Sequence, residues 1–427
     1  MKQLIQNILR ILAKTIIKKY DPDVIGITGS VGKTSTKEAV KMVLKDHYNI
    51  RASAKNYNNE LGVPLTIIGV EESPGKNILG WIKVFLSAIG LILLRDDNYP
   101  KILILEMGAD KEGDIGYLVD IAPCKIGILT NISESHLEFF GTVAKVKKEK
   151  KKIIEHLESD GYALINCDID GVCDMKGDTK ANVLTFGFDK TTDISVSDAI
   201  ISYDEDDKLS GINFKLMHSG NVVPVFMPKA LGFAHIYSAL AAVGVGSIYG
   251  LNLVDIAKNL SQFEPPKGRM RLIEGIKKTL IIDDTYNSSP ASSKAALEVM
   301  QEVKLQEKAK KIVVLGDMLE LGKFTSEKHK EIGLRVLESE IDVLITKGEA
   351  ARDIAKGAIE AGMSKDKVFS FSSNKEAGKF LQERLGEGDL VLVKGSQGMR
   401  MEKIVKEVMA RPLQAKDLLV RQGGEWI

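Results

Sequence analysis

The stretch Val24-Ile-Gly-Ile-Thr-Gly-Ser-Val-Gly-Lys-Thr-Ser-Thr36 decides how this chain folds. Its first part, Val24–Thr28, is apolar and β-branched, which predicts a buried strand of a parallel sheet. The residues up to Gly32 predict a tight turn, and a helix is expected to open at Lys33. In that arrangement the backbone N–H groups of the turn and the dipole of the helix both attract an anion. The stretch therefore predicts an α/β domain with a phosphate-binding loop.

The same loop is close to the P-loop pattern of nucleoside-triphosphate-binding proteins. In that pattern the lysine, here Lys33, reaches the β- and γ-phosphates, and the next hydroxyl, here Thr34, meets Mg²⁺. The strict pattern has glycine where this chain has Ile27, so the prediction depends on the flanking strand and helix. A chance Gly-Lys-Thr in an ordinary strand–turn–helix is the alternative. The residues expected to hold the nucleotide are Gly29, Ser30, Val31, Gly32, Lys33, Thr34 and Ser35.

Composition narrows the class of protein. A length of 427 residues suggests two or three domains, with enough chain for sizeable cores. With a net charge of +1 and 27% charged residues, nothing points to a nucleic-acid partner or a disordered tail. Cys124, Cys167 and Cys173 lack metal-type spacing, and such a sparse, odd set fits a reducing cytosol. The N-terminus lacks the apolar core and cleavage site of a signal peptide.

Two apolar segments are expected to form helices. Residues 1–20 place leucine and isoleucine at helical spacing with Lys and Arg opposite, which fits a helix packed on the next domain or one lying on a membrane surface. Residues 80–94 are apolar except for Lys83 and Ser87, and they are too short for an unbroken span of about 20 residues. A buried or lid helix is the favoured interpretation, and an interfacial helix is the alternative.

Two metal-ligand candidates follow apolar strands. Glu106 ends the predicted strand 101–106, and His136 comes soon after the predicted strand 125–130. Open α/β sheets bind their ligands at the carboxyl ends of parallel strands, so the two side chains could converge on one cation. Taken singly, a glutamate or a histidine is more often an ordinary surface or core residue.

Lys150 lies on the apolar stripe of the predicted helix 142–157. The stripe consists of Val143, Val146, Ile153, Ile154 and Leu157, whereas Lys145, Lys148, Lys151 and Lys152 fall off it. A lysine directed towards the interior needs a partner or a changed charge state. The alternative is that its aliphatic stem carries the ammonium group outwards to water.

The second half of the chain predicts another doubly wound α/β domain. Residues 180–228 alternate in short pieces that suggest a small antiparallel layer, and Glu264–Gly268 is the best domain linker. Beyond it, strands are expected at 280–283, 311–315, 343–346, 368–371 and 390–393, with helices at 291–304, 326–339, 349–361, 374–385 and 400–410. We therefore divide the chain into an N-terminal amphipathic helix (1–22), a central P-loop domain with a mostly parallel sheet (23–264) and a C-terminal Rossmann-like domain (265–427).

Several short motifs occur in a fixed order. Motifs of wide distribution are Thr28–Ser35, Glu106-Met-Gly108, Asn131 followed by His136, and Gly268-Arg-Met270; more selective ones are Asn56–Pro64, Asp284–Ser292, Leu315–Gly322 and Val393–Ser396. Over about residues 24–410 the chain resembles the Mur ligases, ATP-dependent enzymes that form amide bonds in cell-wall precursor synthesis. Within that family it is most similar to the type that adds D-alanyl-D-alanine.

The resemblance implies a role for each candidate residue. Lys33 would hold the γ-phosphate, Thr34 and Glu106 one Mg²⁺, and His136 a second. The family also uses a carbamylated lysine, which corresponds to Lys150 when counted without gaps from His136, with Lys147 as the fallback. The resemblance implies that ATP is bound by Arg269, Asp284, Tyr286 and Asn287. It implies that the other substrates are bound by Lys394, Ser396 and Arg400. The amide-rich loop adds Asn56, Asn58 and Asn59 as further candidates for substrate binding.

The implied reaction joins a nucleotide-linked muramoyl peptide to D-alanyl-D-alanine through an acyl phosphate, in a cytoplasmic monomer without nucleic acid. Three features depart from the family. Only about twenty residues precede the P-loop strand, so the usual N-terminal uridine-nucleotide-binding domain is expected to be missing; Gln397 stands where arginine is usual, and Ser238 where asparagine is common. The alternatives are a pseudomurein-type or folylpolyglutamate-like ligase with another acceptor, and a nucleotide-binding protein without ligase activity.

Overall fold

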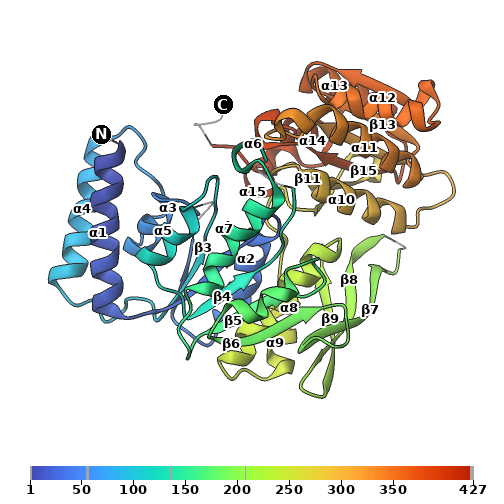
Figure 1. Ribbon diagram of the computed structural model, residues 1–427. Helices are drawn as coiled ribbons and strands as arrows, with labels where there is room; N and C mark the ends of the chain where they lie inside the picture. The colour runs from blue at the N-terminus through green and yellow to red at the C-terminus, as the bar shows by residue number, and fades with distance from the viewer. Residues whose placement is uncertain (1, 54–56, 135–136, 207, 424–427) are drawn as a thin grey trace.

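The protein consists of two α/β units that lie against each other (Figure 1). The computed structural model describes residues 2–53, 57–134, 137–206 and 208–423. The first unit is built on nine strands in the order β2-β3-β1-β4-β5-β6-β7-β8-β9, and the second on six in the order β10-β11-β15-β12-β13-β14. The predicted fold class, a mostly parallel P-loop sheet followed by a Rossmann-like unit, is confirmed.

Strand β1 lies inside the first sheet, as its apolar sequence predicted. It pairs in parallel with β3 on one side and β4 on the other. The strands are β1 (Asp23–Thr28), β2 (Ile50–Ala52), β3 (Ile102–Glu106), β4 (Ile126–Leu129), β5 (Tyr162–Asn166), β6 (Asn182–Gly187), β7 (Ile194–Tyr203), β8 (Leu209–His218) and β9 (Asn221–Pro228). The carboxyl ends of β1, β3 and β4 therefore meet at one edge, where the P-loop, Glu106 and Thr130 follow.

The expected small antiparallel layer is confirmed in β7, β8 and β9, which extend the first sheet. Strand β7 pairs in parallel with β6 through Phe186 and Ile194, and β8 and β9 then add antiparallel. The sequence indicated the three strands correctly but not their attachment, because it does not say which open edge a hairpin will join. Beyond the sheet, Cys167 and Cys173 form a disulfide, which the expectation of a reducing compartment did not anticipate.

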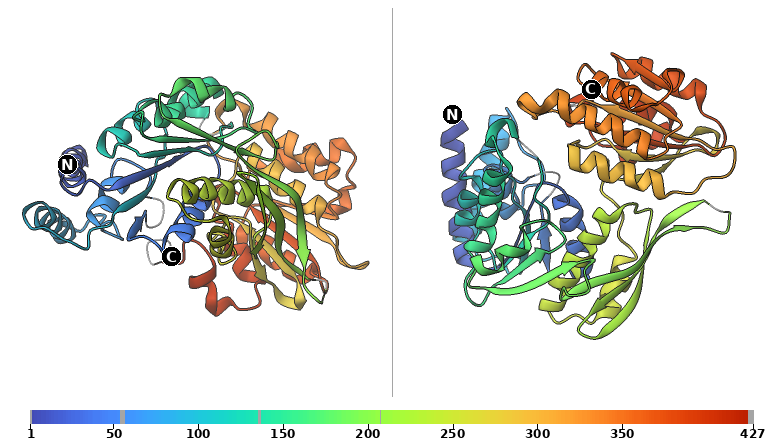
Figure 2. Two further views of the ribbon diagram at one scale, coloured as in Figure 1. Left: turned by 90° about the horizontal axis from the view of Figure 1, so that it is seen from below. Right: turned by 45° about the vertical axis from the view of Figure 1, so that its right-hand side comes forward.

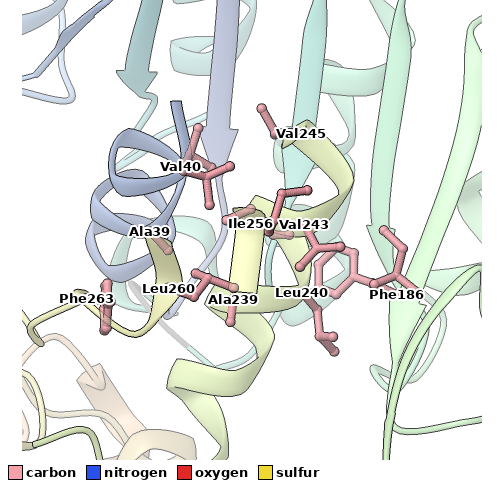
Figure 3. Close-up of a cluster of buried hydrophobic side chains, with 14 of the residues drawn as sticks. Ala39, Val40, Phe186, Ala239, Leu240, Val243, Val245, Ile256, Leu260 and Phe263 are labelled. Carbon is pink, nitrogen blue, oxygen red and sulfur yellow. The ribbon is translucent and has the colours of Figure 1, made fainter. Parts of the chain in front are cut away.

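Three helices cover one face of this sheet. They are α2 (Lys33–Leu44), α8 (Phe233–Ile248) and α9 (Leu253–Leu260). Figure 3 shows side chains of the three helices, among them Val40 of α2, Leu240 of α8 and Ile256 of α9, in one buried cluster that also includes Phe186 of β6. Small residues let α2 and α8 approach closely: a Cβ at Gly246 would lie only 3.0 Å from a methyl group of Val43. This packing fixes the start of α2, and with it the P-loop.

The second unit matches its predicted strands and helices closely. Its sheet consists of β10 (Arg271–Glu274), β11 (Leu280–Asp284), β12 (Lys311–Gly316), β13 (Val343–Lys347), β14 (Val368–Phe371) and β15 (Leu390–Lys394). Its helices are α10 (Pro290–Glu302), α11 (Thr325–Glu338), α12 (Ala351–Ala361), α13 (Asn374–Arg384), α14 (Glu402–Val408) and α15 (Ala415–Leu418). Strand β10, a short antiparallel edge strand that follows the linker and pairs with β11, was not predicted from the sequence.

The remaining helices lie around the other face and outer edge of the first sheet. They are α1 (Lys2–Tyr20), α3 (Gly62–Ile68), α4 (Ile78–Leu93), α5 (Asp114–Ile121), α6 (Leu137–Phe140) and α7 (Val143–Glu155). In Figures 1 and 2, α1 lies at the edge of the molecule farthest from the second unit. Of the described helices, none combines the length and the apolar character that crossing a membrane requires.

The expectation that residues 80–94 form a buried helix is wrong. Helix α4 packs on α1 and α3, yet only Val84 and Ala88 are buried within it. Its remaining face is aliphatic and open to solvent. The apolar composition predicted the helix but could not show that no other element covers this side of it.

Candidate active site

The P-loop joins β1 to α2 as predicted. Gly32, immediately before the helix, has φ of +91°, a conformation that glycine adopts without the strain a side chain would impose. At Gly29 a Cβ would lie 2.0 Å from the hydroxyl of Thr130, so glycine is also required by the neighbouring strand. Thr130 donates to the carbonyl oxygen of Val31 at 2.7 Å, which ties the loop to the end of β4.

Two lysines place their ammonium groups on the same loop. Lys33 donates to the carbonyl oxygen of Gly29 at 2.6 Å, and Lys150, from α7, donates to the same oxygen at 3.1 Å. Burial lowers the pKa of Lys33 to about 8, with nearby Glu106 acting against the shift. Burial, reinforced by the charge of Lys33, lowers the pKa of Lys150 to about 7. An anion in this loop would relieve the repulsion between the two cations.

The burial of Lys150 confirms that it lies on the apolar stripe of α7 and does not reach outwards to water. Its side chain is 2% exposed. Lys147, the fallback, lies elsewhere, with its ammonium group beside Gly171. Val143, assigned to the same stripe, is instead exposed. The geometry therefore distinguishes Lys150 from Lys147 as the lysine of the P-loop.

Glu149, next to Lys150, is a residue that the sequence analysis missed. Its buried carboxylate accepts hydrogen bonds from the backbone N–H groups of Gly113 (2.9 Å) and Ile115 (2.8 Å) and pairs with Lys152 at 2.6 Å. It thus anchors the N-terminus of α5 to α7. No spacing rule connects residues 113 and 149, so only the fold could reveal this contact.

The carboxylate of Glu106 lies beside the first turn of α2. Thr34 Oγ1 donates to Glu106 Oε2 at 3.2 Å, and Lys37 Nζ lies 3.4 Å from Glu106 Oε1. Glu106 is 1% exposed, and its Oε1 has no hydrogen-bond partner within the described part of the chain. A buried carboxylate oxygen and a threonine hydroxyl next to a phosphate loop are the ligand types that Mg²⁺ takes in nucleotide sites.

His136, the predicted second metal ligand, and Asn56, from the amide-rich loop, lie outside the described residues. Within the described ranges there is no group of three or more His, Cys, Asp and Glu side chains that could hold a metal ion. The metal-binding candidates that the structure does place together are Thr34 and Glu106. They fit one Mg²⁺ whose other ligands would be phosphate oxygens and water.

The linker carries Arg269 into the space above the P-loop. Its guanidinium carbon lies 4.0 Å from the centre of the Tyr286 ring, and Tyr286 donates its backbone N–H to Gly268 at 3.0 Å. The carbonyl oxygen of Arg269 lies 3.1 Å from Nε2 of His235, whose pKa burial lowers to about 4. A neutral imidazole thus holds the linker backbone while the arginine side chain faces the loop.

Two of the predicted substrate residues in the second unit are engaged in internal contacts. Lys394, 2% exposed, pairs with Asp284 at 2.6 Å and donates to the carbonyl oxygen of Asn287 at 3.0 Å. Arg400 pairs with the buried Glu402 at 2.6 Å. Ser396, by contrast, lines the main cavity and accepts the backbone N–H of Leu319 at 2.9 Å. Lys394 therefore positions the loop after β11 rather than facing the cavity.

The amide-rich loop approaches the P-loop through its backbone and caps a helix. The carbonyl oxygen of Asn58 accepts the N–H of Gly108 at 2.7 Å, directly after β3. The side-chain oxygen of Asn59 accepts the N–H groups of Leu61 (3.2 Å) and Gly62 (2.9 Å) at the start of α3. Both asparagines line the main cavity.

A cavity of about 860 Å³ brings these parts together. Its walls come from the P-loop, β3, the linker, the polar loops of the second unit and the first turns of α1. Its lining includes Ser30, Lys33, Thr34, Glu106, Arg269, Tyr286, Asn287, Ser396 and Gln397, together with Gln3, Gln6 and Asn7. The last three residues were not predicted from the sequence, because nothing in their spacing indicates that they face this cavity.

The phosphate loop thus holds the partly buried Lys33 and the buried Lys150, and the second α/β unit lines the same cavity. This arrangement fits the class of ATP-dependent ligases. Family models match the chain in two parts: the Mur ligase middle domain over residues 27–79 and 86–246, and the Mur ligase glutamate ligase domain over 268–397. The chain belongs to the Mur ligase family.

Individual relatives are similar over nearly the whole chain. The UDP-N-acetylmuramoyl-tripeptide–D-alanyl-D-alanine ligase of Bacillus subtilis is 32% identical over 95% of this chain and 80% of its own length. The crystal structure of MurF from Thermotoga maritima in complex with ADP superposes with a TM-score of 0.77 at 26% identity, covering 96% of this chain and 84% of that one. MurF from Acinetobacter baumannii gives the same TM-score over 94% and 79%. These similarities support ATP binding by this chain.

Proposed function

We propose that this protein is an ATP-dependent ligase that adds D-alanyl-D-alanine to a UDP-N-acetylmuramoyl-tripeptide. The proposal takes its substrates from the relative in Bacillus subtilis and its chemistry from the residues around the cavity. The observation that carries it is the convergence of Lys33, Lys150 and the Thr34–Glu106 pair on one phosphate loop. A nucleotide-binding protein without ligase activity would not need a second lysine, the buried Lys150, at that loop.

ATP, a substrate of this reaction, binds with its phosphates at the P-loop. The N-terminus of α2 and the ammonium group of Lys33 hold the phosphates. Arg269 reaches the same space from the linker, and Tyr286 and Asn287 line the cavity where the nucleoside lies. Asp284 accepts the backbone N–H of Met270 at 3.2 Å, which keeps the linker next to the nucleotide loop.

Thr34 and Glu106 would hold Mg²⁺, with His136 proposed for a second ion. Bound Mg²⁺ would neutralise charge on the transferring phosphoryl group. Glu106 is suited to this role because its Oε1 accepts no hydrogen bond from the described residues and its burial keeps it away from bulk water. The residues present therefore fit the ion that the family implies.

Lys150 is proposed to act as a carbamate. Its ammonium group first gives one proton to solvent. The neutral amine then attacks the carbon of CO₂, a C–N bond forms as one C–O π bond breaks, and a second proton leaves to solvent, so a buried cation becomes a carbamate anion. The pKa of about 7 leaves much of the amine neutral at physiological pH. The product is an anion close to Lys33, so the repulsion between the ammonium groups of Lys33 and Lys150 is replaced by attraction between Lys33 and the carbamate.

The reaction proceeds in two steps. A carboxylate of the muramoyl peptide attacks the γ-phosphorus, forming a P–O bond as the bond to ADP breaks, with Lys33 and Arg269 stabilising the negative charge that develops. The amine of the dipeptide then attacks the acyl carbon, and phosphate leaves as the amide forms. Ser396 and Gln397 line the wall opposite the P-loop, where the amine would enter.

The division of the chain at Glu264–Gly268 fits this proposal, with a first domain that binds phosphate and a second that delivers the amine. Contacts between Glu134 and Lys328 (3.3 Å) and between the backbones of Glu138 and Glu320 (3.2 Å) hold the two together. We further propose a monomer, because this chain by itself supplies the P-loop, the linker and the second α/β unit that line the cavity. We also propose a cytoplasmic enzyme, because ATP and nucleotide-linked precursors are found there.

Phosphate release by the purified chain tests the proposal. ATP and Mg²⁺ are supplied with the UDP-linked muramoyl tripeptide, with D-alanyl-D-alanine, with both and with neither. We expect release that requires both, and a product heavier than the tripeptide substrate by the added dipeptide. Lys33→Met is the matched negative control, because it removes the phosphate-binding ammonium group with little change in shape.

Other results would redirect or overturn the proposal. If phosphate is released only with a different acceptor or amine, the protein is a ligase but these substrates are wrong. Because Gln397 stands where the family usually has arginine, other acceptors and amines should be tried first if the expected pair fails. Binding of ATP without phosphate release in any mixture of acids and amines would reject ligase activity.

A further inference from the structure

A long aliphatic stripe on α4 is exposed along its whole length. Its members, at helical spacing, are Ile78, Leu79, Ile82, Leu86, Ile89 and Leu93. Leu86 is 62% exposed and Leu93 is 75% exposed, whereas Val84 and Ala88 on the opposite side of the helix are buried against neighbours. Contiguous apolar surface of this extent on a water-exposed protein marks a place where something binds.

The neighbouring helix α1 adds to the same edge of the molecule (Figure 1). It packs on α4, and it exposes Leu4, Ile8 and Ile11 at helical spacing. Lys19 joins the two helices by donating to the carbonyl oxygens of Leu91 (2.8 Å) and Leu94 (2.6 Å) at the end of α4. The two helices thus form one packed pair, the α1–α4 pair, with exposed aliphatic side chains on both members.

The α1–α4 pair carries almost only positive charge. Residues 1–20 and 76–95 contain eight Lys and Arg and no Asp or Glu, whereas the whole chain has 59 basic and 58 acidic residues. Asp120 on α5 neutralises part of this charge by pairing with Arg10 and Lys14, and Asp97 pairs with Arg95. Lys18, Lys76 and Lys83 are exposed and form no ion pair with the described residues.

We propose that the α1–α4 pair docks the protein on an anionic lipid membrane, with α4 lying flat in the headgroup region. A basic helix with an aliphatic face is the pattern of interfacial binding. The 16 residues of α4 extend for about 24 Å, shorter than the ~30 Å hydrocarbon layer, so the helix lies on the membrane rather than across it. A second copy of this chain is a poorer occupant, because a two-fold contact would oppose cation to cation.

Docking would bring the catalytic cavity close to the lipid surface. Gln3, Gln6 and Asn7 line that cavity, and they are on the same helix as the exposed Leu4, Ile8 and Ile11. The distance between the cavity wall and the lipid is therefore on the order of one helix diameter, about 10 Å. This inference does not depend on which substrates the cavity takes.

Vesicle flotation with the full chain tests the proposal. Vesicles are made of phosphatidylcholine alone or of an equal mixture with phosphatidylglycerol. We expect binding to the mixture, weakened by salt, and little binding to the neutral lipid. Ile82→Gln with Leu86→Gln should weaken binding about tenfold or more, and Lys18→Gln with Lys83→Gln should weaken it about tenfold.

Matched controls come from the second unit. Leu334→Gln removes a comparably exposed aliphatic side chain (46%) from α11, and Lys379→Gln removes an exposed lysine from α13. Both should bind vesicles like the parent protein, and all variants should keep its melting temperature. Absence of vesicle binding, equal binding to neutral lipid, or full binding by the α4 variant would overturn the proposal. So would a dimer in solution that the α4 variant dissociates, since a second copy would then cover the stripe.

Discussion

Lys33 and Lys150 share one acceptor, the carbonyl oxygen of Gly29, at 2.6 and 3.1 Å. Lys150 is buried and Lys33 is partly buried, and they come from helices that start more than a hundred residues apart in the chain, α7 and α2. Like charges held this close lower each other's affinity for protons. The arrangement is stable only if one amine gives up its charge or an anion enters between them, and both occur in the proposed catalytic cycle.

Activity should therefore depend on CO₂. Removing dissolved CO₂ should lower kcat, and bicarbonate should restore it. The neutral amine that reacts with CO₂ predominates above the pKa of about 7 and is lost as the pH falls below it. The stimulation by bicarbonate should therefore disappear below about pH 6. Steady-state rates across this range, with and without bicarbonate, measure the effect.

Lys150→Gln should lose about 100-fold or more in kcat and all response to bicarbonate, because the amide is neutral and cannot form a carbamate. Lys147→Gln is the matched control from the same helix, and it should behave as the parent protein. A carbamate signal from ¹³C-labelled bicarbonate should appear in the parent and be absent from the Lys150 variant. If both variants show the signal, a lysine other than these two carries the modification.

The Thr34–Glu106 pair predicts a metal-dependent defect. Glu106→Gln should lower kcat by about 100-fold and raise the Mg²⁺ concentration needed for half-maximal rate, because a carboxylate ligand becomes an amide. Glu38→Gln is the control, since Glu38 also contacts Lys37, at 3.1 Å, but is 32% exposed, and the Thr34 hydroxyl donates to Glu106 instead. An equal loss in both variants would indicate that Lys37, rather than a metal, accounts for the effect.

Much of this site could be predicted from the sequence, because the informative residues are close together in the chain. The P-loop is one continuous stretch, and the stripe of α7 identified Lys150 as buried without any knowledge of what it contacts. Glu106 was identified from its place at the end of an apolar strand. In each case the periodicity or the strand end specifies the environment of the residue.

The rest depended on contacts between distant segments. Nothing local shows that Glu149 accepts the N–H groups of α5, or that the first turn of α1 lines the cavity. Residues 80–94 were expected to be buried because apolar helices usually are; the sequence cannot say that no other element covers α4. Lys394 was assigned to substrate because its motif suggests it, whereas its burial and its pair with Asp284 are tertiary facts.

Lys394 should therefore matter for stability. It is buried with Asp284 at 2.6 Å, and burial lowers its pKa. Lys394→Met leaves a buried carboxylate without its cation and should destabilise the protein by about 3–5 kcal/mol. Adding Asp284→Asn should recover part of that loss, and thermal unfolding of the two single variants and the double variant measures the coupling. A Lys394→Met protein with unchanged melting temperature but a raised KM for the dipeptide would instead support direct substrate binding.

The first turns of α1 should contribute to binding of the nucleotide-linked peptide. Gln6 donates to Glu60 at 2.7 Å, and both residues line the cavity on the side away from the second unit. Gln6→Ala with Asn7→Ala should raise the KM for the muramoyl substrate about fivefold for each hydrogen bond lost. The KM for ATP and the kcat should stay the same, because the P-loop is not touched.

Thr15→Ala is the matched control on the same helix. Its hydroxyl is exposed and donates to the carbonyl oxygen of Ile11 at 2.9 Å, and it does not line the cavity. It should leave all three constants unchanged. A rise in the KM for ATP in the Gln6 and Asn7 variant would mean that α1 acts through the P-loop. Unchanged constants would mean that the muramoyl substrate occupies the part of the cavity between Arg269 and the second unit, without reaching α1.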